Sequence, residues 1–179
     1  MLDRMRSILI VTDIQGNLAQ LMFDRETLFR NAGIIIDGAR ILGIPILWVE
    51  QYPKGLGPTV PEIASHLTGL EPLPKRTFST LRDPEIGRRF IESGRDQVIL
   101  TGIETHVCVH QTALDCIARG IETQIVADAV SSRTAFNKTI GLDKMSRAGA
   151  VITSVETVLF ELLGTSEGKE FKKILEIVK

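Results

Sequence analysis

Short runs of apolar residues recur along this sequence of 179 residues, and segments with helical spacing separate them. The clearest runs are Ile8 to Val11, Ile46 to Val49 and Val98 to Leu100, and none of them alternates with polar residues. A strand that is covered by helices on both faces has this composition. Six strands alternating with helices predict a parallel sheet, because parallel neighbours need crossover connections. The expected fold class is α/β, a three-layer α/β/α sandwich around a six-stranded, doubly wound, Rossmann-like parallel sheet.

Turn and cap signals place the remaining elements. Asp83 followed by Pro84 is a strong helix start, with Asp as the N-cap and Pro as the first helical residue. We expect a single domain over residues 1–179, since no repeat or linker interrupts the pattern. The expected strands are residues 7–13, 45–50, 76–78, 98–100, 121–128 and 150–153, and the expected helices are residues 18–42 in two parts, 83–93, 107–119, 138–148, 154–163 and 167–178.

Composition and charge disfavour several classes of function. The formal net charge is −1, which argues against nucleic acid and anionic membranes as partners. The two cysteines lack Cys-x-x-Cys spacing, so we expect no disulfide scaffold, zinc site or thioredoxin-like motif. No apolar run approaches the ~20 residues that span a bilayer, and Ile8 to Val11 is too short for a signal peptide. We expect a cytoplasmic protein that acts on a small molecule without a cofactor.

Cys108 lies where the fourth expected strand gives way to a helix. The run Val98 to Leu100 ends at Thr101 and Gly102, and helical spacing begins at Val107. The first turn of a helix offers free N–H groups and partial positive charge, which make a thiol easier to deprotonate. Cys108 is therefore a candidate nucleophile, although packing in the core is the more usual role of a free cysteine.

The helical phase distinguishes the two cysteines. At ~100° per residue, Cys108 shares the polar side of the helix with Thr112 and Asp115. Cys116 borders the apolar side, so we expect it to pack in the core. The two thiols cannot form a disulfide on one straight helix, because eight residues at ~1.5 Å rise separate them by about 12 Å. The expected core stripe consists of Val107, His110, Ala113, Leu114 and Ile117.

Asp13 and Lys75 are candidate partners of Cys108. Ligands of a doubly wound sheet bind at the carboxyl ends of the strands, where the strand order reverses. Asp13 follows the first strand, which neighbours the fourth strand at that point in the common order. Taken alone, Asp13 fits a strand-ending turn and Lys75 fits a solvated surface group. Together with Cys108 they supply the base, the cation and the nucleophile that thiol catalysis needs.

Four motifs resemble the isochorismatase-like cysteine hydrolases over nearly the whole chain. They are Ile-Val-Thr-Asp-Ile-Gln at residues 10–15, Pro-Lys-Arg-Thr-Phe-Ser at 74–79, Gly-Ile-Glu-Thr-His-Val-Cys-Val at 102–109 and Val-Ala-Asp-Ala-Val-Ser-Ser-Arg at 126–133. The third motif is specific by itself, and the first two are specific through their order and spacing. The subgroup that the chain resembles includes the YcaC-like bacterial proteins and the animal isochorismatase-domain proteins.

The resemblance implies a catalytic triad of Asp13, Lys75 and Cys108 on a six-stranded, doubly wound sheet. It also implies a non-proline cis peptide between Ile103 and Glu104, which aims the backbone amides of Glu104 and Cys108 into an oxyanion hole. In the implied reaction the Cys108 thiolate attacks a carbonyl carbon, Asp13 passes the proton to the leaving group, and water releases the acyl-enzyme. Members of the family are commonly oligomers, which implies a homo-oligomer, a dimer or larger.

The chain departs from the nicotinamidases of this family. These enzymes bind a metal with an Asp-x-His pair and a further His after the second strand, whereas residues 49–54 read Val-Glu-Gln-Tyr-Pro-Lys. We therefore expect no metal and no nicotinamidase activity. His106 and His110 have the spacing of a metal-binding pair on a helix, but no third ligand is evident nearby. True isochorismatases generally lack the cysteine, so the family name does not identify the substrate.

We expect a hydrolase of a small amide, ureide or related carbonyl compound. The alternative is a catalytically silent protein on the same fold that binds, assembles or senses through an ordinary thiol. A nucleotide-binding Rossmann protein is disfavoured, because residues 13–17 read Asp-Ile-Gln-Gly-Asn instead of the start of Gly-x-Gly-x-x-Gly. The candidate substrate contacts are Gln15, Phe78, Ile103 and Thr105, and packing, turn or cap roles are their alternative.

Overall fold

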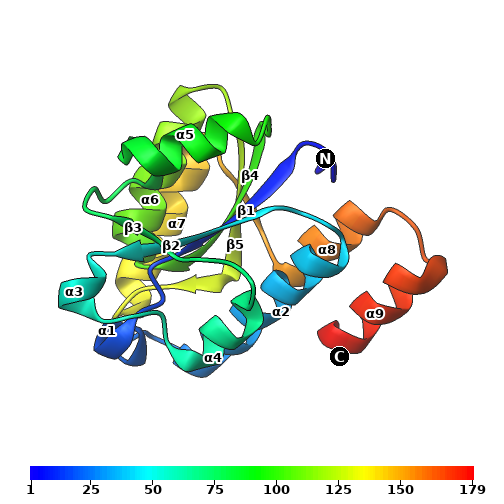
Figure 1. The fold of residues 1–179 in the computed structure, drawn as a ribbon, viewed down its shortest axis with the longest axis horizontal. Coiled ribbons are helices and arrows are strands. Elements are labelled where there is room, and N and C mark those ends of the chain that lie inside the picture. Colours follow the sequence, from blue (N-terminus) through cyan, green and yellow to red (C-terminus); the bar gives the residue numbers. More distant parts are fainter.

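The computed structural model describes residues 1–179, in which six parallel strands form one sheet in the order β3-β2-β1-β4-β5-β6. The strand order reverses at β1, so that β1 and β4 are neighbours as predicted. Every paired strand is parallel, which confirms the doubly wound α/β fold (Figure 1). The strands are β1 (Ser7–Thr12), β2 (Ile46–Gln51), β3 (Leu73–Lys75), β4 (Gln97–Ile103), β5 (Glu122–Ser131) and β6 (Val151–Thr153).

Helices cover both faces of the sheet. One face packs against α2, α8 and α9, and the other packs against α5, α6 and α7 (Figure 1). None of the helices combines the length and the apolar character that crossing a membrane requires. The α-helices are α1 (Gly16–Gln20), α2 (Arg25–Ile41), α3 (Pro53–Leu56), α4 (Pro61–Ala64), α5 (Pro84–Glu92), α6 (His110–Ala118), α7 (Ala135–Arg147), α8 (Val155–Leu163) and α9 (Gly168–Val178), with 3₁₀ turns at Ser65–Leu67 and Thr80–Arg82 and a π-helix at Thr105–Val109.

The two hydrophobic cores lie on opposite faces of the sheet. Leu9 and Val11 of β1 belong to one core, and Ile8 and Ile10 belong to the other. Successive side chains of a strand point to opposite faces, so an uninterrupted apolar run serves both cores at once. All six residues of β1 are buried, which places this strand at the centre of the molecule.

Two predictions from the sequence were wrong in detail. The third strand is Leu73–Lys75 instead of residues 76–78, so Lys75 ends the strand where the sequence suggested that it precedes one. In the helical segment around Cys108, only Ala113 of the expected core stripe is buried. The residues that are buried there are Thr105, Cys108, Val109, Thr112, Ala113 and Cys116.

Two physical causes explain why the buried residues around Cys108 differ from the expected core stripe. The segment begins as a π-helix, whose wider turn alters the spacing of side chains on one face. Thr112 is a polar residue that can be buried because its hydroxyl accepts a hydrogen bond of 2.9 Å from the backbone N–H of Thr80. Cys116 is fully buried in the core, as the sequence predicted.

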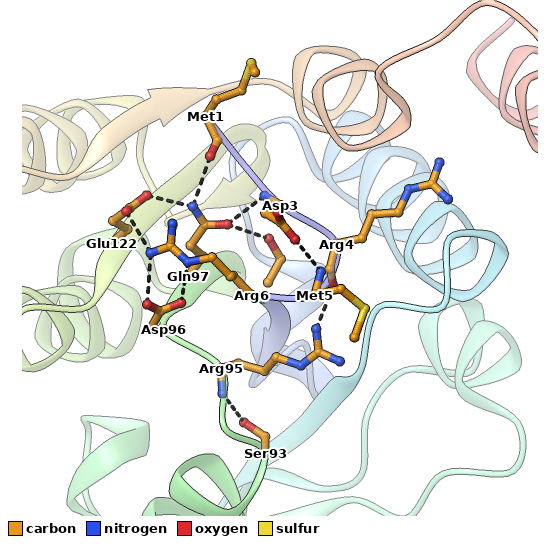
Figure 2. A network of polar contacts seen from close by, with 11 residues as sticks. Met1, Asp3, Arg4, Met5, Arg6, Ser93, Arg95, Asp96, Gln97 and Glu122 are labelled. Carbon is orange, nitrogen blue, oxygen red and sulfur yellow. Dashed lines mark hydrogen bonds and ion pairs between the residues drawn. The ribbon is translucent and has the colours of Figure 1, made fainter.

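A polar network ties the N-terminal segment to the sheet at the end opposite the carboxyl ends of the strands. Figure 2 shows Gln97, the first residue of β4, at its centre. Its Oε1 accepts from the N–H of Asp3 at 2.7 Å and from the hydroxyl of Ser7 at 3.2 Å. Its Nε2 donates to the carbonyl of Met1 at 3.0 Å and to Glu122 at 2.8 Å. Gln97 is fully buried, so its amide depends on these bonds, of which the one to Ser7 joins two buried residues.

Replacing Gln97 with Leu should lower the free energy of unfolding by about 1–3 kcal/mol, because the N-terminal segment loses its hydrogen bonds to β4 and the buried hydroxyl of Ser7 loses an acceptor. Urea unfolding followed by circular dichroism measures this change. The control is Arg6→Ala, which removes ion pairs between exposed side chains and should cost less than about 1 kcal/mol. Equal losses in the two variants would contradict a central role of Gln97.

Candidate active site

Three chemically active side chains meet at the carboxyl end of the sheet. Asp13 follows β1, Lys75 ends β3, and Cys108 lies in the π-helix that follows β4. Strand β2 separates β3 from β1, so the long side chain of Lys75 crosses the end of β2 to reach Asp13. Its Nζ lies 2.7 Å from Asp13 Oδ2. The structure therefore brings together the three residues that the sequence singled out.

Asp13 has an unusual backbone conformation and one free oxygen. Its φ of 55° lies in the left-handed region, which aspartate tolerates better than most residues and which turns the chain away from β1. Oδ2 accepts from Lys75, whereas Oδ1 is buried without a hydrogen-bond partner. Burial raises the pKa of Asp13, and the charge of Lys75 acts in the opposite direction. Oδ1 is thus an acceptor that is available to a proton from a neighbouring group.

Lys75 is a fully buried cation with two fixed acceptors. Its Nζ donates to Asp13 Oδ2 and, at 2.6 Å, to Oε1 of Gln51. The exposed fraction of its side chain is 0%, against 3% for Asp13. A buried charge needs an opposite charge and hydrogen bonds around it, and the two acceptors provide both.

The pKa of Cys108 is raised, which differs from the expectation for a thiol at a helix start. Burial and the negative charge of Asp13 raise the pKa of Cys108 to about 12, although Lys75 acts to lower it. The residue is 7% exposed and belongs to the wall of a cavity. In the turn that leads to Cys108, the peptide bond between Ile103 and Glu104 is cis. A nucleophilic Cys108 therefore needs a base, and Asp13 is the carboxylate whose charge acts on the thiol.

The cavity above the triad has a volume of about 120 Å³. Its wall is mainly apolar, and no lysine or arginine side chain belongs to it. The larger hollow between α2, α8 and the C-terminus contains none of the three residues, whereas Lys75 lines a separate hollow of about 370 Å³ beside Tyr52 and Arg76. The residues that line the cavity are Asp13, Leu18, Gln51, Leu56, Phe78, Ile103, Glu104, Val107 and Cys108.

The candidate substrate contacts divide into two pairs. Phe78 and Ile103 line the cavity, and Phe78 is 53% exposed at its rim. Gln15 and Thr105 do not line it, and both are fully buried. Trp48 does not line the cavity either. It packs against the core that contains Leu9 and Val11, and its indole N–H donates to Thr59 Oγ1 at 2.8 Å.

Gln51, Leu18, Leu56 and Val107 line the cavity but were not identified from the sequence. Leu18 and Leu56 come from α1 and α3, two short helices beside the carboxyl ends of the strands (Figure 1). Their apolar character looks like core packing in the sequence, so it gives no signal of a binding wall. Gln51 could have been found from its position, because it ends the strand that lies between Asp13 and Lys75.

The turn before Cys108 is held from two sides. The carboxylate of Glu104 accepts from the backbone N–H and the guanidinium of Arg133, at 3.1 and 3.2 Å. On the other side α7 contacts the backbone of Thr105 and His106 through Gly141, where a Cβ atom would lie 2.8 Å from the carbonyl of Thr105. Such a distance is shorter than normal van der Waals contact, so only glycine fits at this position.

The two histidines near Cys108 do not line the cavity. Nδ1 of His106 lies 2.9 Å from the hydroxyl of Ser132, and Nε2 of His110 is buried without a partner. Burial lowers the pKa of His110. No group of three or more His, Cys, Asp or Glu side chains in the chain is arranged to hold a metal ion.

Comparisons with known proteins agree with this geometry. The sequence model of the isochorismatase domain matches residues 7–157. Isochorismatase domain-containing protein 1 of Salmo salar is 47% identical over 147 residues, which are 81% of this chain and 51% of that protein, so the chain spans about half its length. The secreted isochorismatase effector Isc1 of Phytophthora sojae is 37% identical over 178 residues, which are 97% of this chain and 84% of that protein.

Solved structures show the same fold. The MAR1 ribonuclease of Caenorhabditis elegans has a TM-score of 0.92 and 36% identity, covering 99% of this chain and 91% of that chain. YcaC of Pseudomonas aeruginosa has a TM-score of 0.91 at 22% identity and covers 98% of this chain and 90% of that chain. At that identity the second likeness supports the fold alone.

Replacing Asp13 with Asn should make Cys108 easier to alkylate. The Asp13 charge raises the pKa of the thiol, so its removal increases the thiolate fraction at a given pH, whereas Lys75→Met should decrease it. Iodoacetamide labelling of Cys108, followed by peptide mass spectrometry across a pH series, measures both changes. In the unmodified protein the rate should still rise above about pH 9 without reaching a plateau. Slower labelling of Asp13→Asn would contradict the assigned cause.

Proposed function

The chain belongs to the isochorismatase family, and we propose that it is a cysteine-dependent hydrolase of small amides or related compounds with a C–N bond. The observation that carries this proposal is the buried Oδ1 of Asp13, which has no hydrogen-bond partner and belongs to the same cavity wall as Cys108, a thiol with a raised pKa. An acceptor without a donor next to a thiol with its proton is the arrangement that general-base activation of a nucleophile needs.

The proposed reaction begins with proton transfer to Asp13. As Oδ1 accepts the thiol proton, the Cys108 sulfur bonds to the carbonyl carbon and the carbonyl electron pair moves to oxygen. The ammonium of Lys75 keeps the neighbouring carboxylate oriented. The backbone amides of Glu104 and Cys108, at the start of the π-helix, are the proposed donors to the oxyanion.

The second half of the reaction releases both products. When the C–N bond breaks, the proton on Asp13 moves to the departing nitrogen and a thioester remains on Cys108. Water then attacks this thioester while Asp13 accepts one of its protons, and the C–S bond breaks. The proton returns to sulfur, so the products are a carboxylic acid and an amine or ammonia, and the enzyme is unchanged.

The cavity favours a small, uncharged substrate. Most of its wall is apolar, and its charged members, Asp13 and Glu104, are already paired with Lys75 and Arg133, so the wall offers no free cation. A phosphodiester would bring negative charge next to these carboxylates without a cation in the wall. The Caenorhabditis elegans protein is named a ribonuclease, and oligoribonucleotides are therefore the appropriate second substrate class in a screen.

The geometry argues against the thiol-sensor alternative. A redox-sensing cysteine is an accessible thiolate near neutral pH, whereas Cys108 is 7% exposed and its pKa is raised to about 12. A substrate that fits the cavity can be attacked without a standing thiolate, because Asp13 removes the proton during the reaction.

We also infer a homo-oligomer in the cytoplasm. Large apolar side chains stay exposed on α7 and β6, namely Phe136, Ile140, Val151 and Ile152, and such groups are typical of subunit contacts. Both cysteines are free thiols, as is usual in a reducing compartment. The Phytophthora sojae relative is named a secreted effector, so the compartment needs its own localisation experiment.

Replacing Cys108 with Ala should abolish amide hydrolysis, with at least a ~100-fold loss of ammonia release in a screen of small amides. Cys116→Ala is the matched control, because it is the same substitution at a cysteine of the following helix. Cys116 is fully buried and does not line the cavity. This variant should keep turnover within about twofold. Full activity of Cys108→Ala on a confirmed substrate would refute the mechanism.

Neutral amides with short apolar acyl groups should be better substrates than analogues that carry a carboxylate. A carboxylate would be buried against a mainly apolar wall whose acidic residues already occupy the neighbouring cations Lys75 and Arg133, so kcat/KM should differ at least ~10-fold. Paired assays of a short-chain amide and the half-amide of the corresponding dicarboxylic acid measure the ratio. A preference for the charged analogue would show that the proposed substrate class is wrong.

A further inference from the structure

Gln51 lies between the two charged members of the triad. It is the last residue of β2, which separates β1 from β3, and it pairs with Lys75 in the sheet. Its Oε1 accepts from Lys75 Nζ at 2.6 Å. Its Nε2 donates to the carbonyl of Arg76 at 3.1 Å, which fixes the direction of the amide group. Gln51 therefore presents a fixed, neutral acceptor to the ammonium.

The backbone of Gln51 is held by a second glutamine. Strand β1 ends at Thr12, so no strand residue of β1 faces Gln51 on that side. The side chain of Gln15 takes this place. Its Oε1 accepts from the N–H of Gln51 at 2.6 Å, and its Nε2 donates to the carbonyls of Gln51 at 3.2 Å and of Gly57 at 2.7 Å. The side chain of Gln15, which makes all of these contacts, is fully buried.

The two fixed acceptors determine where the rest of the ammonium points. A lysine ammonium has three donors, and Lys75 gives one to Asp13 and one to Gln51. With two of these directions set, the third is set by the tetrahedral geometry of the nitrogen. Both acceptors belong to the cavity wall that also contains Cys108, and the charge of Lys75 acts to lower the pKa of that thiol, so Cys108 is the group toward which we expect the third donor to point.

We propose that Gln51 is a positioning residue, which aims the remaining N–H of Lys75 at the Cys108 sulfur, and that Gln15 holds Gln51 in register for this task. The proposal deepens the proposed hydrolase function and rests on it for its kinetic consequences. Its chemical consequence, a change in the reactivity of Cys108, does not need a substrate. Gln15 is thereby assigned a role behind the site instead of the direct substrate contact that the sequence suggested.

A neutral acceptor suits this position better than a charged one. Glutamate in place of Gln51 would keep an acceptor for Lys75 but add a second negative charge near the thiol and lose the donor to Arg76. Methionine would keep the approximate length and remove both hydrogen bonds. The two variants therefore separate loss of the acceptor from gain of charge.

The experiment compares Gln51→Met and Gln51→Glu with the unmodified protein by alkylation of Cys108 across a pH series and by steady-state kinetics. Both variants should label at least roughly threefold more slowly at a given pH, with Gln51→Glu the slower of the two. With an amide substrate, kcat should fall about tenfold while KM stays within about twofold. Gln15→Glu, which keeps the acceptor for the N–H of Gln51, should change labelling in the same direction by a smaller factor.

Gln124→Met is the matched control, since Gln124 is a buried glutamine on β5 outside the cavity. It should change neither labelling nor kcat by more than about twofold. Unchanged labelling in Gln51→Met would overturn the proposal, even if kcat falls, because the residue would then act on the substrate and not through Lys75. If no amide is hydrolysed by the unmodified protein, the proposed function fails while the labelling result still decides the role of Gln51.

Discussion

Lys75 and Asp13 carry opposite charges at a place from which water is almost wholly excluded, and neither charge is stable there without the other. Removing one partner of such a pair typically costs about 3–5 kcal/mol, because the remaining charge stays buried and uncompensated. The side chains are 0% and 3% exposed, and their contact joins the edge strand β3 to the central strand β1. The fold of this corner and the charges that face Cys108 therefore depend on the same contact.

The topology of the sheet makes this contact possible. A parallel sheet collects the carboxyl ends of all its strands at one edge, so residues 62 positions apart in the chain can meet there. Lysine is long enough to cross the end of the intervening strand, and the glutamine that ends that strand supplies the second acceptor on the way. Part of the apolar wall, Leu18 and Leu56, comes from α1 and α3, which lie beside the same edge (Figure 1).

The strand runs were readable in the sequence because they depend on local patterns, whereas Asp13 and Lys75 stood out only as a set with Cys108 and through the family motifs. Strand β3 was misplaced, since three residues that include Pro74 carry too little pattern to define a strand. The direction of the shift in the pKa of Cys108 was also missed, because burial and the facing carboxylate outweigh the helix start and depend on tertiary packing. Gln15 looked like a substrate contact because a sequence cannot show that its amide is already occupied by backbone groups.

Gly141 has a consequence for how this site can diversify. Because α7 touches the backbone beside Cys108 with no room for a side chain, the nucleophile and its turn form one rigid unit with the helix layer behind them. Leu56 and Phe78, on the opposite wall, are partly exposed and stand on a short helix and a loop that carry no part of the triad. Substitutions at Leu56 and Phe78 can therefore admit new molecules without changing the residues that hold Cys108.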